Sequence, residues 1–237
     1  MIQLSNLTKK YGKLEVLKSL NLKIESGKVT AIVGPNGAGK TTIIKCILGL
    51  IKSNSGEIFI QDERINGDCE YRENIGYMAQ VARFPENLTV RNVLEMITDL
   101  RKEKHPERDE ELIERFHLTT EFGKKIKNLS GGNRQKVNAC IAFLFDPDIL
   151  ILDEPTASLD PVASSILKDK IKKEKLAGKT IILTSHIMAE VEELADDIIF
   201  LLEGSIYYEG STQGLISGTG EQKLERAIAR MMEGAGV

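Results

Sequence analysis

The sequence predicts an α/β fold in which a parallel sheet forms the core and a helical segment is inserted. Short apolar runs, which are typical of buried strands, alternate with segments of helical spacing. A glycine-rich loop joins one of these runs directly to a helix, and a central stretch has helical spacing throughout. Because strand–helix–strand alternation is typical of parallel sheets, the central helical stretch is interpreted as an insertion into an α/β core.

Composition excludes several classes of protein. The chain has 237 residues, of which 41% are hydrophobic and 28% charged, as in ordinary globular proteins. Its net charge of −3 offers no general attraction to nucleic acid, and we expect no nucleic-acid partner. The longest apolar run, Ala139–Phe145, is far shorter than the roughly 20 residues that span a bilayer, so we expect no membrane crossing. Three widely spaced cysteines and the lack of a secretory signal pattern favour a reducing cytoplasm.

The first third of the chain shows strand patterns on both sides of one helix. Leu20–Ile24 alternates apolar and polar residues, which predicts a half-buried strand, and Val29–Val33 predicts a short buried one. Glu57–Gln61 and Ile75–Met78 are interpreted as two further strands. The helix after the glycine-rich loop is marked by apolar residues at helical spacing: Ile43, Ile44, Ile47, Leu48 and Leu50.

From Pro85 to Phe145 the sequence predicts three helices. A charged run, RKEKHPERDEELIER, lies between the first two and is interpreted as a solvated helix–loop–helix surface. The apolar residues that mark the helices are Val90, Val93, Leu94, Ile97 and Leu100 in the first, Leu112, Ile113 and Phe116 in the second, and Val137, Cys140, Ile141 and Leu144 in the third.

After this insertion the strand–helix alternation returns. Ile149–Leu152 and Thr180–Thr184 predict strands, with a helix between them from Pro161 to about Ala177. Gly210–Gly220 is interpreted as a link to a last short amphipathic helix. We therefore expect a single domain over 1–237, with a core of 1–84 and 146–210, a helical insertion over 85–145 and a short C-terminal tail over 211–237.

The glycine-rich loop matches a phosphate-binding pattern. Gly34-x4-Gly39-Lys40-Thr41 follows a strand and opens a helix, so backbone N–H groups and the positive end of the helix can surround a polyphosphate. Lys40 would reach the β- and γ-phosphates, and the Thr41 hydroxyl would ligate Mg²⁺. The predicted phosphate-binding residues are Gly34, Pro35, Asn36, Gly37, Ala38, Gly39, Lys40, Thr41 and Thr42. The alternative is a tight glycine turn without a ligand.

Two acidic residues follow the apolar run Ile149–Leu152. A buried strand would deliver Asp153 and Glu154 to the carboxyl edge of the sheet, where α/β folds bind ligands. Asp153 suits the coordination shell of Mg²⁺, and Glu154 suits a base that orients and deprotonates an attacking water. Taken alone, the pair could be two surface acids at a strand end, but the phosphate loop favours the functional interpretation.

The segment Leu129-Ser130-Gly131-Gly132-Asn133 resembles the signature motif of ATP-binding cassette (ABC) ATPases. Ser130 is a good N-cap, and the two glycines leave the amides of the helix start bare for an anion. The resemblance covers about residues 1 to 210. It implies a P-loop NTPase parallel-sheet core, an N-terminal antiparallel β subdomain and an inserted α-helical subdomain. It also implies that the chain binds ATP and Mg²⁺ and hydrolyses ATP to ADP and phosphate.

The same resemblance implies further site residues. Tyr11 resembles the aromatic residue that stacks on adenine, and Gln80 the loop glutamine that touches Mg²⁺ and water. His186 resembles the switch histidine near the γ-phosphate, so the implied catalytic residues are Glu154, His186 and Gln80. Ser158-Leu159-Asp160 resembles the dimer-contact loop, which adds Asp160 to the nucleotide site. Each residue alone has an ordinary structural explanation, but their occurrence in the family's order favours the functional one.

Asn133 departs from the family pattern, which usually has glutamine at this position. Its side chain is one methylene shorter, so we expect a contact to nucleotide across a dimer to be lost or bridged by water. Ser130, Gly131 and Gly132 do not depend on it. The expected result is altered affinity and not inactivity.

The resemblance also implies partners. In the family, each ATP lies between the phosphate loop of one copy and the signature residues of another, which predicts a homodimer around two Mg-ATP. We expect a separate integral-membrane permease to dock on the helical insertion near Gln80–Thr89, with the ATPase on the inner, cytoplasmic face of the cell membrane.

Two segments bear on the subfamily. GYMAQVARFPENLTVRNVLEM and TSHIMAEVEELADDIIFLLEG resemble the NosF-like ATPases of copper-processing transporters associated with nitrous-oxide reductase maturation. More broadly, they resemble ATPases of ABC-2 type exporters. The alternative is a soluble ABC ATPase of an assembly machine, such as that of iron–sulfur cluster biogenesis. The transported substrate and the direction of transport are not encoded in this chain.

Overall fold

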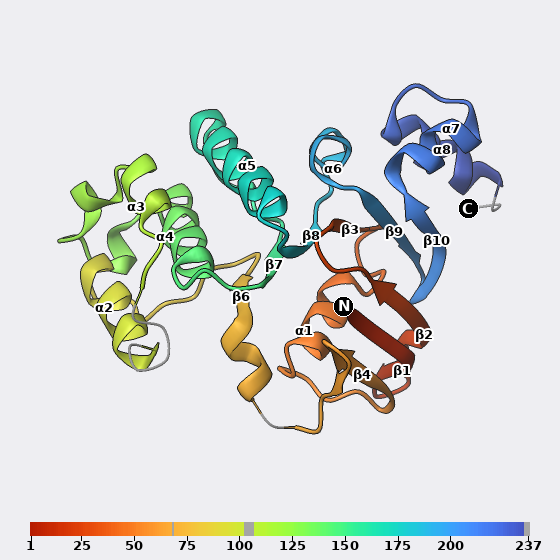
Figure 1. Ribbon diagram of the computed structural model, residues 1–237, viewed down its shortest axis with the longest axis horizontal. Coiled ribbons are helices and arrows are strands. Elements are labelled where there is room, and N and C mark those ends of the chain that lie inside the picture. The colour runs from red at the N-terminus through yellow and green to blue at the C-terminus, as the bar shows by residue number, and fades with distance from the viewer. Residues whose placement is uncertain (68, 102–106, 235–237) are drawn as a thin grey trace. The chain divides into compact units, whose positions relative to one another are not determined.

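The computed structural model describes residues 1–67, 69–101 and 107–234. The chain divides by its internal contacts into two compact units, one formed by 1–73 and 180–237 and the other by 74–179. We call these the first and the second unit; their elements are labelled in Figure 1. The prediction of a single domain with a core, an insertion and a tail stays a prediction.

An antiparallel sheet forms the N-terminal part of the first unit. Its strands are β1 (Ile2–Tyr11), β2 (Leu14–Ile24), β4 (Ser55–Ile60) and β5 (Glu63–Arg64), in the order β2-β1-β4-β5. The implied antiparallel subdomain is therefore confirmed. The alternation at the end of β2 marks a real strand, which begins earlier than predicted, and β1 was not predicted.

Parallel strands of the first unit place the glycine-rich loop. β3 (Val29–Val33) lies between β8 (Thr180–Thr184) and β9 (Asp197–Leu202) and is parallel to both, while β10 (Ser205–Ser211) is antiparallel to β9. Every residue of β3 and β8 is buried, as the short apolar runs predicted. α1 (Lys40–Ile47) begins directly after the loop that follows β3.

The prediction that Gly210–Gly220 is a link is wrong. It contains the end of β10 and a helix, α7 (Thr212–Thr219). The Ser211 side chain caps this helix by accepting a hydrogen bond from the Gly214 amide at 3.0 Å, and the left-handed Gly220 ends it. The predicted last helix is confirmed as α8 (Leu224–Gly234), which packs on α7 and on α6 (Met188–Leu194).

The second unit holds the helical insertion and two parallel strands. β6 (Ile75–Met78) pairs with β7 (Ile149–Asp153), and a 3-10 helix, Glu70–Asn74, precedes β6. The helices are α2 (Val90–Arg101), α3 (Glu111–Arg115), α4 (Gly131–Phe143) and α5 (Pro161–Leu176), with 3-10 turns at Leu118–Glu121 and Ile126–Asn128. The three predicted helices are confirmed. Leu100, however, does not belong to the apolar face of α2, because it is 77% exposed.

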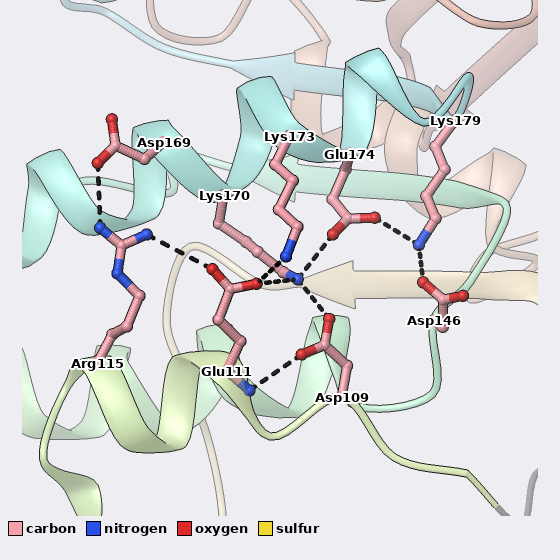
Figure 2. Close-up of polar contacts among 9 residues, drawn as sticks. All are labelled: Asp109, Glu111, Arg115, Asp146, Asp169, Lys170, Lys173, Glu174 and Lys179. Atoms are coloured by element: carbon pink, nitrogen blue, oxygen red, sulfur yellow. Dashed lines mark hydrogen bonds and ion pairs between the residues drawn. The ribbon is translucent and has the colours of Figure 1, made fainter.

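A network of charged side chains joins the start of α3 to α5, as Figure 2 shows. Lys170 on α5 is buried, with 1% of its side chain exposed, and its ammonium contacts the carboxylates of Asp109, Glu111 (3.0 Å) and Glu174 (2.8 Å). The network extends through Lys173 to Glu111, through Lys179 to Glu174 and Asp146, and through Arg115 to Glu111 and Asp169.

This network corrects the interpretation of the charged run. Residues 102–106 of the run lie outside the described residues, but Asp109 and Glu111 are partly buried against Lys170 and do not form a freely solvated surface. Oxygens of Asp109, Asp146 and Glu174 lie within 4.8 Å of one another. Because the ammonium groups of Lys170 and Lys179 already neutralise them, we assign no metal to this cluster.

Replacing Glu111 by Gln should destabilise the fold in a pH-dependent way. The hydrogen bond from Lys173, followed by that from Lys170, lowers the pKa of Glu111 from 4.5 to about 2. Since the folded-state pKa is the lower one, the carboxylate stabilises the fold above its unfolded pKa, and this contribution is lost as the pH falls toward the folded value. Urea unfolding between about pH 7 and about pH 3 should show the wild-type advantage narrowing. An advantage that stays constant over this range would contradict the assignment.

Candidate functional site

The glycine-rich loop brings bare backbone to the end of β3. Gly34, Gly37 and Gly39 have φ values of 147°, 83° and 110°, which favour glycine. A Cβ at Gly34 would lie 2.2 Å from the carbonyl oxygen of Leu201, and one at Gly39 would lie 2.7 Å from Cδ2 of Leu17. The loop therefore packs its own backbone against neighbouring elements of the first unit, and its shape depends on glycine.

Lys40 lies at the start of α1 and folds back over this loop. Its ammonium donates to the carbonyl oxygens of Gly34 at 2.7 Å and Pro35 at 3.1 Å. α1 begins without a side-chain cap, so the positive end of the helix faces the loop. An ammonium group beside a glycine turn at a helix N-terminus is a suitable environment for a phosphate group.

The remaining loop residues differ in exposure. Three residues at the tip are exposed, two are buried beneath them, and the two threonines are intermediate, which leaves the tip open to a ligand while its base is held. These residues are, in that order, Pro35, Asn36 and Gly37, then Ala38 and Gly39, then Thr41 and Thr42.

His186 lies at the same edge of the sheet as the loop. β3 and β8 are parallel, and Ile32 is opposite Thr184. Gly34 and His186 each follow this pair by two residues, so both segments leave the sheet at its carboxyl edge, where α/β folds bind ligands. The His186 side chain is exposed.

Tyr11 ends β1 opposite Leu14, the first residue of β2. Two and three residues further along β2, Val16 and Leu17 lie where they would meet a Cβ at Gly39 of the loop. The hairpin thus leads from Tyr11 to the phosphate loop within the first unit. The ring is 50% exposed, and the Lys9 ammonium lies 5.0 Å from its centroid, so part of the ring remains accessible for stacking.

The two predicted acids lie in the second unit. Asp153 ends β7 and is 2% exposed, and Glu154, which follows it, is 8% exposed. Glu154 has a φ of 53°, a left-handed conformation that is uncommon for a side chain of this kind, so the chain turns sharply after β7. Tyr77 on β6 is affected by this environment. Burial, with a smaller effect from the charge of Asp153, raises the pKa of Tyr77 to about 12.

Gln80 and Glu154 leave their strands at the same edge. β6 and β7 are parallel, and Met78 is opposite Leu152, so each of the two polar residues follows this pair by two positions. The Gln80 side chain is exposed and Glu154 is buried. Within the second unit the fold therefore brings these two predicted residues to a common edge.

The signature segment forms the N-terminus of α4. The Ser130 hydroxyl accepts a hydrogen bond from the Asn133 amide at 3.1 Å, as expected of an N-cap. In the part of the chain that the structure describes, a Cβ at Gly131 would meet nothing within 4 Å, whereas one at Gly132 would lie 2.9 Å from the carbonyl oxygen of Ser158. Gly132 thus packs against the predicted dimer-contact loop, and Gly131 faces open space.

Asn133 and Asp160 both contact their own subunit. The Asn133 side-chain amide donates to Glu121 at 3.0 Å. Asp160 caps α5 by accepting from the Ala163 amide at 2.8 Å and pairs with Lys136 at 3.0 Å, and these contacts, in that order of effect, lower its pKa. The roles predicted for both residues at the nucleotide stay predictions.

Two buried amides of α4 were missed. Gln135 and Asn138 are 4% and 6% exposed and direct their side chains toward the ends of β7 and β6. The signal in the sequence is their spacing of three, which places both polar residues on the same side of a helix whose apolar residues were used to define it.

The donor atoms suit the ligands that were predicted. The Thr41 hydroxyl, the Gln80 amide oxygen and the Asp153 carboxylate are all oxygen donors, which Mg²⁺ prefers. Among the described residues, nothing lies within 4 Å of a Cβ at Gly37, so the exposed tip of the loop leaves room for a phosphate to approach the backbone.

A protein-family model described as ABC transporter matches residues 17–157. This chain belongs to the ABC transporter ATP-binding family. ABC ATPases bind ATP with Mg²⁺ and hydrolyse it, and the predicted activity and ligands are thereby confirmed.

Curated relatives of this ABC ATPase cover nearly its full length. It is 34% identical to the uncharacterized ABC transporter ATP-binding protein YdbJ of Bacillus subtilis, over 96% of this chain and 73% of YdbJ. It is 33% identical to the arginine transport ATP-binding protein ArtM of the same organism, over 89% of this chain and 91% of ArtM. It is 35% identical to the lantibiotic transport ATP-binding protein SrtF of Streptococcus pyogenes, over 90% of this chain and 92% of SrtF.

Solved structures confirm the fold class. An ATP-binding subunit of an ABC transporter aligns with a TM-score of 0.89 at 28% identity, covering 98% of this chain and 99% of that one. A dimeric post-hydrolysis state of the ATP-binding cassette MJ0796, bound to ADP and Pi, aligns with a TM-score of 0.77 at 27% identity, covering 89% of this chain and 98% of that one. The chain is thus an ATP-binding subunit of an ABC transporter, with dimeric relatives.

Replacing Gly34 by Ala should destabilise this ABC ATPase more than replacing Gly37. Both glycines have positive φ, but only at Gly34 would the new methyl group meet a backbone atom, the Leu201 oxygen, at 2.2 Å. Nothing lies within 4 Å of a Cβ at Gly37, so that variant isolates the backbone strain. We expect thermal unfolding to give a Tm lower by at least about 5 °C for Gly34→Ala than for Gly37→Ala. Equal values would contradict the close approach.

Proposed function

We propose that this ATPase drives a separate membrane permease by closing as a homodimer around two Mg-ATP and reopening after hydrolysis. The observation that carries the proposal is the pair of helix N-termini, α1 behind the phosphate loop and α4 behind Gly131, each with bare backbone in front of it. One helix N-terminus binds the phosphates of the chain's own ATP, and the other binds the γ-phosphate of the ATP held by the second copy.

Each site residue has a role in this scheme. Lys40 and the loop amides bind the phosphates, Tyr11 stacks on adenine, and His186 contacts the γ-phosphate. Glu154 orients the attacking water and accepts its proton, a role supported by its burial and by the sharp turn that fixes its backbone. Thr41, Gln80 and Asp153 would hold Mg²⁺, which neutralises phosphate charge.

The coupling between hydrolysis and movement follows from linkage. ATP that contacts both copies stabilises the closed dimer, and loss of the γ-phosphate removes the group that bridges them. The dimeric relative with ADP and Pi supports this scheme. Ser130 and Gly132 complete the same contact, with Gly132 held against Ser158. Asn133 directly follows Gly132 in the sequence, and Asp160 follows Ser158 by two residues.

We propose a permease as the partner because relatives of the chain are named as ATP-binding proteins for the transport of arginine, the transport of a lantibiotic and the import of phosphonates. In the described ranges 1–67, 69–101 and 107–234, no helix has the length and apolarity to span a membrane. We place the docking surface near Gln80–Thr89, where Val81 is an apolar residue with 65% exposure. This arrangement puts the ATPase on the inner face of the cell membrane.

The subfamily is proposed from the two segments that resemble copper-processing and ABC-2 type exporter ATPases. Co-purification of the chain with an integral-membrane protein from detergent-solubilised membranes tests the transporter function. Recovery with soluble scaffold proteins alone would instead favour the assembly-machine alternative.

Replacing Glu154 by Gln should separate ATP binding from hydrolysis. Loss of a general base costs about 10²- to 10⁴-fold in turnover, while the phosphate loop is unchanged. Phosphate release and equilibrium binding of a fluorescent ATP analogue measure the two steps. Lys40→Ala is the contrasting variant and should lose nucleotide affinity. Rapid hydrolysis in Glu154→Gln would remove Glu154 as the base.

Replacing Gly131 by Ala tests the site shared between two copies. The new methyl group meets nothing within 4 Å among the described residues, so the fold and its Tm should be unchanged. In the closed dimer, however, it would stand between the α4 amides and a phosphate, and we expect turnover to fall at least about tenfold. ATP-dependent dimerisation, measured by size-exclusion chromatography in a Glu154→Gln background, should weaken in parallel.

The matched control is Gly123→Ala in the same unit, where a Cβ also meets nothing within 4 Å. This variant should keep wild-type turnover and dimerisation. Wild-type behaviour of Gly131→Ala would show that nothing approaches the signature glycines, and the shared site would be wrong.

A further inference from the structure

Asn138 is a polar side chain buried on α4, two turns after the signature glycines. It is 6% exposed, and its Nδ2 donates to the carbonyl oxygen of Ala79 at 2.7 Å. Ala79 follows Met78, the last paired residue of β6, and directly precedes Gln80. Because the peptide group is planar, this hydrogen bond orients the Ala79–Gln80 peptide and hence the start of the segment that carries Gln80.

A second amide extends the contact toward Glu154. The Asn138 Nδ2 also donates to Oε1 of Gln135 at 3.3 Å, and Nε2 of Gln135 lies 3.5 Å from the carbonyl oxygen of Pro155, the residue after Glu154. The Gln135 contact is at the long limit of a hydrogen bond, so the bond from Asn138 to Ala79 is the stronger tie. Both bonds end on backbone that has just left a strand.

Packing of α4 alone does not require the side-chain amides of Asn138 and Gln135. An apolar residue would fill the same space on α4 without the cost of removing an amide from water, which must be offset by hydrogen bonds. The hydrogen bonds of Asn138 and Gln135 instead end beside the two residues that leave β6 and β7 at a common edge. The arrangement thus connects the helix that begins at the signature to the backbone next to Gln80 and Glu154.

We propose that Asn138 is a positioning residue for ATP hydrolysis, which couples the placement of the signature helix to that of Gln80 and, through Gln135, of Glu154. This inference rests on the proposed function, in which these two residues act on the attacking water. When ATP closes the dimer on the N-terminus of α4, the hydrogen bonds of Asn138 and Gln135 hold the ends of β6 and β7 in a fixed position relative to α4. Without these bonds ATP still binds, but the attacking water is poorly placed.

The test replaces Asn138 by Leu, which has the same number of non-hydrogen side-chain atoms and no hydrogen-bond donor. In the full chain we expect kcat to fall about tenfold while KM for ATP changes by less than about twofold, because positioning acts on the chemical step. Val137→Ala is the matched control, since it removes a neighbouring buried side chain of α4 but leaves the amide in place. It should lower the Tm and keep kcat within about twofold of wild type.

Asn138→Ser provides a second variant if the Leu variant does not fold, because its short hydroxyl cannot reach Ala79. Wild-type kcat in either folded variant would overturn the proposal. An equal loss of kcat in Val137→Ala, at the same loss of Tm, would also overturn it by showing a general effect of destabilising α4. The proposed function is tested separately, by ATP hydrolysis in the wild type and its loss in Glu154→Gln. Failure of the proposed function can therefore be distinguished from failure of the inference about Asn138.

Discussion

Bare backbone in front of a helix N-terminus is the constraint on which the rest of this protein depends. Amide groups can bind phosphate oxygens only where no side chain stands in the way. α1 directly follows Gly39, and α4 begins with Gly131. At Gly34 the contact with Leu201 leaves no room for a Cβ, so the loop keeps its shape through close packing. At Gly131 none of the residues that the structure describes would meet a Cβ within 4 Å, which leaves the space that a site for an external ligand requires. The same device is thus present at both helices that we propose to bind the shared nucleotide.

Parallel strand pairing then decides which of the predicted site residues lie at the same edge of a sheet. In the first unit, the pairing of β3 with β8 brings Gly34 and His186 to one edge. In the second unit, the pairing of β6 with β7 does the same for Gln80 and Glu154. Because parallel strands end at the same edge, strand pairing by itself brings together residues that are far apart in the sequence. The order and direction of the strands therefore determine which chemical groups lie at each edge.

Buried polar groups hold the helices of the second unit in place relative to its strands and to each other. Lys170 is surrounded by carboxylates from the start of α3 and from α5, so its charge is paired on removal from water. Asn138 instead donates to backbone beside Gln80. The ionic network fixes how α3 packs on α5, and the amide fixes how α4 meets the strand ends. Stability and positioning are thus served by different polar groups of one unit.

Many of these strands, turns and helices could be predicted from the sequence, because they depend on the chemistry of neighbouring residues. The run Val29–Val33 and the loop after it predicted β3 and the phosphate loop, since apolar strands and glycine turns are determined by neighbouring residues. The helices of the insertion and the capping by Ser130 followed for the same reason. The prediction of a link over Gly210–Gly220 was wrong because the small polar residues of this segment favour a loop. Burial of Leu215 and Ile216 in α7 overrides that preference.

What the sequence determined by itself, therefore, was a set of features that depend on the order of nearby residues: the short buried strands, the glycine turn and the acids at a strand end. Only the tertiary structure decided which distant groups meet, because pairing across 61 residues, as between Asp109 and Lys170, leaves no periodic signal in the chain. The same holds for Asn138 and Ala79, which are 59 residues apart. Burial turns such polar residues from ordinary surface groups into fixed contacts, since each must find a partner once water is excluded.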